Sequence, residues 1–188
     1  MSNWVAGRQQ PKVALLRGIN VGRAKRVAMA DLRALVEGLG YTNVRTLLNS
    51  GNVVFTVPGS AKGDPASRIE AALEKQIGVS SRVIVLSAAE LDRIVKDNPL
   101  LEVANDPSRL LVAVPRTTSG LKRLAALRTP PTATDAFEVG RRAAYLWCSD
   151  GILASRPAEA ILKDPKAETT TRNWGTILKL HALMQEPG

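Results

Sequence analysis

The alternation of hydrophobic and polar positions predicts a sheet with two helices in the first half of the chain. Short apolar runs with the length of strands occupy residues 12–18, 43–48, 53–57 and 81–87. Apolar residues at helical spacing occupy 29–39 and 65–78. The resulting order, β-α-β-β-α-β, is that of a ferredoxin-like fold, so we expect an antiparallel sheet covered by helices.

The second half repeats most of this order. The pattern predicts strands at 109–115, 134–140 and 142–148, and helices at 88–97, 119–127, 155–164 and 174–184. No closing strand is obvious, and no strong sequence repeat links the halves. We therefore expect an α+β protein of two ferredoxin-like subdomains, βαββαβ followed by a βαββα variant. The predicted divisions are a flexible arm at 1–11, a first subdomain at 12–87, and a second at 88–188 packed against it.

The predicted first and third strands, "VALLRG" (13–18) and "VVFTV" (53–57), are largely apolar on both alternating faces. A sheet that is buried on both faces has this pattern. Helices would cover one face. We expect the second half, or another chain, to cover part of the other.

Composition narrows the class of protein. The chain has 188 residues, of which 45% are hydrophobic, enough for one core or two small ones. The chain has one cysteine, Cys148, so an intrachain disulfide is excluded. It also has only one histidine, and these two residues are too few for a structural zinc site. No apolar run approaches the roughly 20 residues of a membrane span, and the first residues lack the apolar stretch of a secretory signal. We expect a soluble cytoplasmic protein without a metal or cofactor.

Positive charge is concentrated near the N-terminus. The net charge is +9, and residues 8–33 hold seven Lys and Arg residues against Asp31 alone. A local positive field favours an anionic partner such as a phosphate, a nucleotide, a nucleic acid or an acidic protein face. The alternative is that the basic residues serve only solubility.

The loop at 18–26, within "LLRGINVGRAKRVAM", joins a predicted strand to a helix. Glycines let backbone N–H groups approach a ligand, and a helix N-terminus attracts anions. Arg23, Lys25 and Arg26 crowd this positive end. The spacing matches neither G-x-G-x-x-G nor a Walker loop, so a solvated basic loop with glycine turns is an equal alternative.

A second basic segment, "TTTRNWG" (169–175), opens the last predicted helix. Thr171 or Asn173 can cap this helix, which places Arg172 at its positive end. Arg172 would then either meet an anionic ligand or form an internal ion pair, with Glu168 or with a carboxylate of the other half.

Four ordered blocks resemble one bacterial family, domain of unknown function 1697. They are "LLRGINVG" (15–22), the trio Met29, Leu32 and Arg33, "SGNVVF" (50–55) and "TTRNW" (170–174), and "GILASR" (151–156) is similar to a further segment. The resemblance runs from Val13 to Leu183. It implies an α+β fold with ferredoxin-like character in two subdomains, and no established activity. The family's signature positions fall here on Arg17, Gly18, Asn20, Gly22, Ser50, Gly51, Asn52, Arg172, Asn173 and Trp174. Arg23 stands where a second glycine is frequent, and Asn49 where glutamine is.

Topology predicts that two of these blocks meet. In a ferredoxin-like sheet the first and third strands are antiparallel neighbours, so the loop after strand one and the "NSGN" turn (49–52) share one rim. Arg172 and Asn173 are placed beside them only because they share the polar character. The predicted ligand-binding residues are Arg17, Gly18, Asn20, Gly22, Arg23, Lys25, Arg26, Asn49, Ser50, Asn52, Arg172 and Asn173.

Three functions fit this site. The first is binding of a phosphate-bearing ligand: a nucleotide, a sugar phosphate or a nucleic-acid backbone. The second is an enzyme that stabilises a developing anion with arginine and backbone N–H groups, although neither Ser50 nor Cys148 lies in a nucleophile motif and no catalytic residue is assigned. The third is a protein–protein module with an acidic partner, in which Trp4 or Trp147 anchors the interface. We expect a monomer or a weak homodimer.

Overall fold

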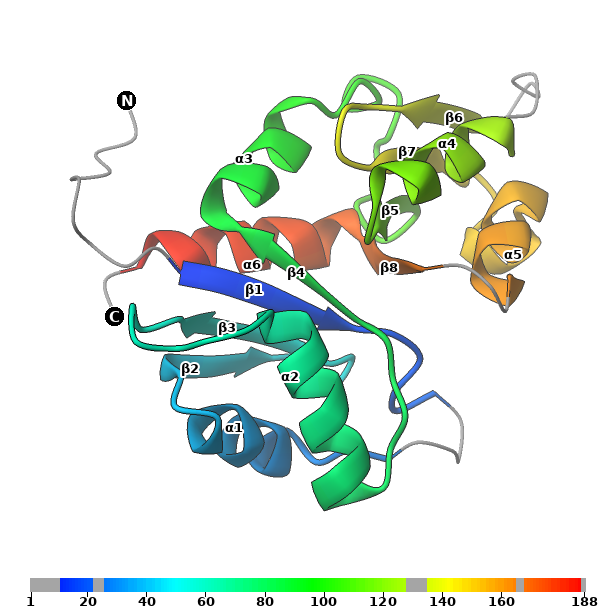
Figure 1. Ribbon diagram of the computed structural model, residues 1–188. Coiled ribbons are helices and arrows are strands. Elements are labelled where there is room, and N and C mark those ends of the chain that lie inside the picture. Colours follow the sequence, from blue (N-terminus) through cyan, green and yellow to red (C-terminus); the bar gives the residue numbers. More distant parts are fainter. Residues whose placement is uncertain (1–10, 22–25, 128–134, 165–167, 187–188) are drawn as a thin grey trace. The chain divides into compact units, whose positions relative to one another are not determined.

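The computed structural model describes residues 11–21, 26–127, 135–164 and 168–186 (Figure 1). The chain divides into two units, Met1–Ala88 with Glu186–Gly188, and Ala89–Gln185. The described residues form a four-stranded antiparallel sheet in each unit, together with helices. The predicted α+β class with antiparallel sheets is confirmed. No described helix combines the length and the apolar character needed to cross a bilayer.

The first unit follows the predicted order of elements. Its members are β1 (Pro11–Leu16), α1 (Met29–Gly38), β2 (Thr42–Leu47), β3 (Asn52–Thr56), α2 (Pro65–Ala72) and β4 (Val83–Ser87). The sheet order is β2-β3-β1-β4. Asp64 starts α2 because its carboxylate accepts the Ser67 N–H, and Pro65 occupies the first helical position, where no N–H is needed. The last turn of this helix, η1 (Leu73–Ile77), is π-helical.

Both faces of the first sheet are buried, as the apolar strands predict. One face packs against α1 and α2, which lie side by side in Figure 1, through Ala14, Leu16, Val53 and Phe55. The alternate positions are buried too, among them Val13, Leu15, Val54 and Leu86, each no more than 1% exposed. Close packing of these buried side chains holds the strands in place, and with them the ends from which the loops begin.

The second unit has the same strand order, β6-β7-β5-β8. Its elements are α3 (Ala88–Lys96), β5 (Leu110–Pro115), α4 (Thr118–Ala126), β6 (Ala136–Val139), β7 (Ala144–Trp147), the 3₁₀ turn η2 (Ile152–Ala154), α5 (Arg156–Lys163), β8 (Thr169–Asn173) and α6 (Trp174–Gln185). From β5 to β8 the order is β-α-β-β-α-β, as in the first unit.

The prediction that the second half lacks a closing strand is wrong. β8 pairs antiparallel with β5, from Leu111 opposite Asn173 to Pro115 opposite Thr169. Its buried positions are threonines and an arginine rather than aliphatic residues, so a search for apolar runs does not detect it. β-branched threonine nevertheless suits a strand.

Two residues named as functional candidates belong to the interior. Cys148 is fully buried beside the core of the second unit, and burial raises the pKa of its thiol. Trp147 is 8% exposed, so it does not present an interface in the way the sequence suggested. Trp4 lies outside the described residues.

Candidate functional site

The loop after β1 and the turn between β2 and β3 meet at one end of the first sheet. Leu15 pairs with Asn52, and the Leu16 N–H donates to the Gly51 carbonyl at 2.9 Å. For the described residues of the loop, the predicted meeting with the turn is therefore confirmed. We call the described residues 17–21, 26–28 and 48–51 the first rim.

Asn20 joins the two parts of the first rim through three side-chain hydrogen bonds, which we call the Asn20 clamp. Its φ is 56°, a left-handed conformation that asparagine tolerates better than most residues. The side-chain Nδ2 donates to the carbonyls of Val27 (2.9 Å) and Asn49 (2.7 Å), and Oδ1 accepts the Val27 N–H at 2.9 Å. Both amide hydrogens are thus used by the fold. These hydrogen bonds give Asn20 a role in orienting the loop, and the phosphate contact that the sequence suggested stays a prediction.

Asn52 has a similar role in the turn. It is fully buried, and its Nδ2 donates to the Leu47 carbonyl at 2.8 Å and to Ser50 Oγ at 2.9 Å. Gly51 adopts φ +77°, and a Cβ atom there would lie 2.7 Å from Ile19 Cδ1. Only glycine fits that position, because the turn presses directly against the β1 loop.

Arginine side chains give the first rim its charge. The Arg17 backbone is held between two residues before β4: its N–H donates to the Arg82 carbonyl, and its carbonyl accepts the Ser81 hydroxyl, each at 2.8 Å. Its side chain is half-buried, whereas Arg26 is exposed. The first rim contains these two guanidinium groups and no carboxylate. The predicted residues Gly22, Arg23 and Lys25 lie outside the described residues.

The N-terminus of α1 adjoins Arg26. Its N-cap residue, Ala28, has no side chain able to accept a hydrogen bond, so no side-chain cap covers the first N–H groups of the helix. Asp31 is the acidic residue of the first turn. Gly18, which is exposed and has φ +65°, presents backbone without a side chain in the same loop.

Two aliphatic side chains on the first rim are also exposed. Val21 is 70% exposed in the loop, and Leu48 is 49% exposed in the turn. Leu48 has φ 56°, a conformation that a leucine rarely adopts. The first rim therefore combines positive charge with accessible apolar surface.

Arg172 and Asn173 end β8, in the second unit. Asn173 caps α6 as predicted, since its Oδ1 accepts the Thr176 N–H (2.9 Å) and hydroxyl (2.7 Å). Arg172 is 8% exposed, and its Nη1 donates to Thr170 Oγ1 (3.0 Å) and to the Thr171 carbonyl (2.7 Å). Burial lowers the pKa of Arg172 to about 10. A single pocket that joins these two residues to the first rim stays a prediction.

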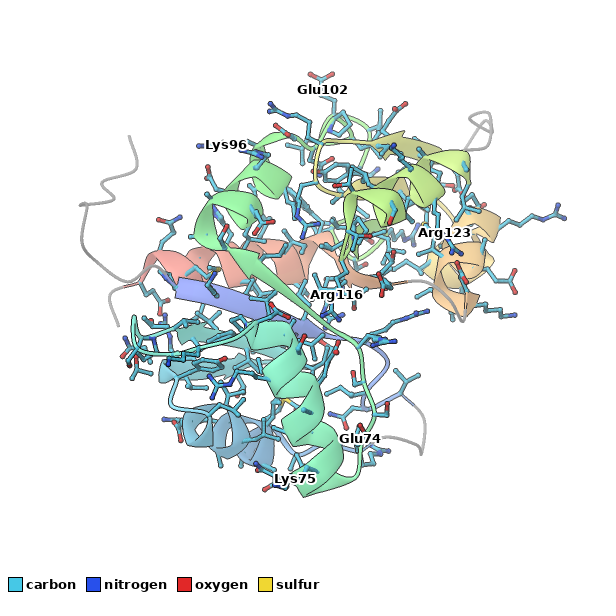
Figure 2. All side chains as sticks on the ribbon, in the orientation of Figure 1. Glu74, Lys75, Lys96, Glu102, Arg116 and Arg123 are labelled. Atoms are coloured by element: carbon cyan, nitrogen blue, oxygen red, sulfur yellow. The ribbon has the colours of Figure 1, made fainter. Side chains whose placement is uncertain are left out.

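The second unit contains a basic pocket that the sequence reasoning missed. Its volume is about 400 Å³, and its lining residues are Glu90, Pro115, Arg116, Thr117, Thr118, Leu121, Arg141 and Arg142. Figure 2 labels Arg116, at the end of β5 where α4 begins. The only signals in the sequence were "PRTTS" after a strand and the pair Arg141–Arg142 in a hairpin turn, and in so basic a chain neither stands out.

The structure also bears on two kinds of chemical group, a reactive thiol and a metal centre. Cys148 is buried with a raised pKa, so it is not an activated thiolate. The described residues contain no group of three His, Cys, Asp or Glu side chains arranged to hold a metal ion.

Comparison with known proteins identifies the same family that the sequence motifs resemble. The profile of the family described as "Protein of unknown function (DUF1697)" matches residues 10–145 and so ends before Arg172 and Asn173. No curated protein matches the chain. Among solved structures, the conserved bacterial protein SP0830 from Streptococcus pneumoniae is similar, with a TM-score of 0.73 and 22% identity over 94% of this chain and 98% of that one. At this identity, the likeness concerns the fold alone.

Proposed function

The chain belongs to the DUF1697 family of proteins of unknown function, and we propose that its first rim binds a phosphate-bearing ligand. The observation that carries the proposal is the Asn20 clamp, which holds a basic loop free of carboxylates against the β2–β3 turn. A site whose backbone is fixed before binding loses little conformational entropy when the ligand arrives. We also propose that each unit is a ferredoxin-like βαββαβ module.

The roles in this proposal follow from chemistry. Arg17 and Arg26 supply charge-assisted hydrogen bonds to phosphate oxygens. Gly18 lets the backbone approach the ligand, and the start of α1 adds N–H groups that no side chain caps. Asn20, Gly51 and Asn52 shape the site without touching the ligand.

A thermal-shift screen of the full chain tests the proposal. The ligands are nucleotides, sugar phosphates, polyphosphate and short nucleic acids, at low and moderate salt. A ligand at 100 times its Kd stabilises the folded state by about 2.7 kcal/mol. A steep loss between low and moderate salt indicates a nucleic-acid backbone, because many counterions are then released.

Two variants assign any stabilisation to the first rim. The double change Arg17→Ala with Arg26→Ala removes its guanidinium groups. Arg33→Ala is the matched control: this residue is exposed on α1, paired with Glu37 at 2.9 Å, and outside the first rim. We expect the double variant to lose the ligand-induced shift and the control to keep it. A shift that survives in the double variant contradicts the proposal.

Exposed Val21 and Leu48 favour a second candidate, an acidic protein segment with aliphatic side chains. Leu48→Asn distinguishes the two, since asparagine tolerates the positive φ while the apolar contact is lost. A peptide of alternating aspartate and leucine would bind the variant more weakly if this candidate is correct. Binding of a small phosphate ligand would be unchanged.

A further inference from the structure

The structure assigns a second binding site to the other unit: we propose that the basic pocket at the start of α4 binds a small, hydroxylated phosphate monoester. We call it the second-unit pocket, with the eight lining residues given above. It is distinct from the first rim, and the two proposals stand or fail separately.

The second-unit pocket occupies the place in its sheet that the first rim occupies in the other. The orders β2-β3-β1-β4 and β6-β7-β5-β8 make β5 the counterpart of β1, and β7 that of β3. Ala113 of β5 pairs with Ala144 of β7, and the Gly140 N–H closes the β6–β7 turn on the Ala143 carbonyl at 2.9 Å. The end of the first strand of the unit and its hairpin turn therefore meet here too, and here they enclose a cavity.

The guanidinium of Arg142 is held in one orientation. Its Nε donates to Glu90 Oε1 at 2.9 Å and its Nη1 to the Pro115 carbonyl at 2.7 Å, and the side chain is 18% exposed. Nη2 makes no hydrogen bond to any described residue. Since Arg142 lines the pocket, this edge is a preformed donor for an oxyanion.

Arg141 and Arg116 add charge around the pocket. Arg141 forms a bidentate pair with Asp97, with both distances 2.9 Å. Arg116 leaves the sheet at the end of β5, where its N–H donates to the Glu168 carbonyl at 2.7 Å. Among the described lining residues three side chains are guanidinium groups and one, Glu90, is a carboxylate. Guanidinium groups are well suited to hydrogen-bond phosphate oxygens.

Hydroxyl groups line the side of the second-unit pocket formed by α4. Thr117 Oγ1 accepts the Gly120 N–H at 3.2 Å and shares a 2.8 Å hydrogen bond with Ser119 Oγ, while Thr118 lines the cavity directly. These hydroxyl groups supplement the arginines as polar groups of the pocket.

The size and lining of the pocket define the ligand class. A volume of about 400 Å³ lies within the range of small-molecule sites and leaves room for more than a phosphate ion. The described lining residues include no aromatic side chain on which a base could stack, and their apolar members are Pro115 and Leu121. The hydroxyl of Thr118, which lines the pocket, suits a ligand hydroxyl. A phosphorylated sugar or polyol meets these requirements better than a nucleotide does.

The alternative is that the arginines only tie the β6–β7 turn to α3 and β5. Titration of the isotope-labelled full chain, followed by amide NMR, separates the two. The probes are inorganic phosphate, glucose 6-phosphate and glucose. We expect glucose 6-phosphate to shift the amides of residues 116–119 saturably and more tightly than phosphate, and glucose to leave them unmoved.

Three variants test whether glucose 6-phosphate binding depends on the arginines of the second-unit pocket. Arg116→Gln removes one charge, and Arg142→Lys keeps the charge but loses the guanidinium edge, so each should weaken glucose 6-phosphate binding about tenfold. Arg123→Gln is the control, because Arg123 lies farther along α4 (Figure 2), pairs with Asp164 at 2.7 Å and is outside the second-unit pocket. The affinity of this variant for glucose 6-phosphate should stay within about twofold of the wild type. If Arg142→Lys does not fold, Arg116→Gln decides. Amides 116–119 that do not move, or that move equally in Arg116→Gln, overturn the inference, whatever the first rim binds.

Discussion

Replacing Asn20 by glycine should loosen the first rim and destabilise the protein by about 3 kcal/mol. The change leaves the positive φ at position 20 unstrained, so it isolates the loss of the three side-chain hydrogen bonds to Val27 and Asn49. A net contribution of about 1 kcal/mol for each of the two partly buried bonds to Val27 gives about 2 kcal/mol. The exposed bond to Asn49 contributes less than either of these, and the added backbone freedom of glycine costs about 0.5–1 kcal/mol, which brings the total to about 3 kcal/mol.

Urea unfolding of the wild type and two variants measures this difference. The control is Asn43→Gly: Asn43 has nearly the same φ, 52°, is exposed, and makes no side-chain hydrogen bond to any described residue. We expect the control to cost less than about 1 kcal/mol. Hydrogen exchange at the Val27 amide should also accelerate in Asn20→Gly, since its acceptor is gone. Equal costs for the two variants, with Val27 still protected, would refute the clamp.

Three further results should follow. Gly51→Ala should destabilise the fold by at least about 2 kcal/mol in urea unfolding, because the new Cβ would meet Ile19 at 2.7 Å and φ is +77°; a cost near zero would mean that the turn does not press on the loop. Hydrogen bonds from Arg141 hold the pKa of Asp97 below its ordinary 3.8, so this pair stabilises the fold above about pH 4 and the stabilisation is lost as pH falls through the lowered value. The stability difference between wild type and Asp97→Asn should therefore be present at pH 6 and vanish in acid. A difference that grows in acid would contradict a stabilising ion pair with a lowered Asp97 pKa. Cys148 should react with a thiol reagent only after unfolding, and rapid reaction of the native protein would contradict its burial.

Much of this fold could be predicted from the sequence, because most strands are short apolar runs and most helices have clear periodicity. The first rim could be predicted as well, since the order βαββαβ brings the ends of β1 and β3 together. β8 could not, because it buries Thr169, Thr170 and Arg172 in place of aliphatic side chains.

Individual roles were harder to predict than positions. An asparagine in a glycine-rich loop can serve as a ligand donor or hold the loop in place, and the sequence does not reveal the three hydrogen bonds that Asn20 makes within the fold. The second-unit pocket was missed for a related reason. Arg116 and Arg142 are 26 residues apart in a basic chain, and only the antiparallel pairing of β5 with β7 brings them to one cavity.

The most direct test of a phosphate site at the first rim is an amide NMR titration that follows Gly18 and Ser50. The titrant is the most stabilising phosphate ligand of the thermal-shift screen, compared with its dephosphorylated counterpart. The account predicts that both amides shift saturably with the phosphate ligand and do not move with the counterpart. Unmoved amides at saturating ligand would contradict it.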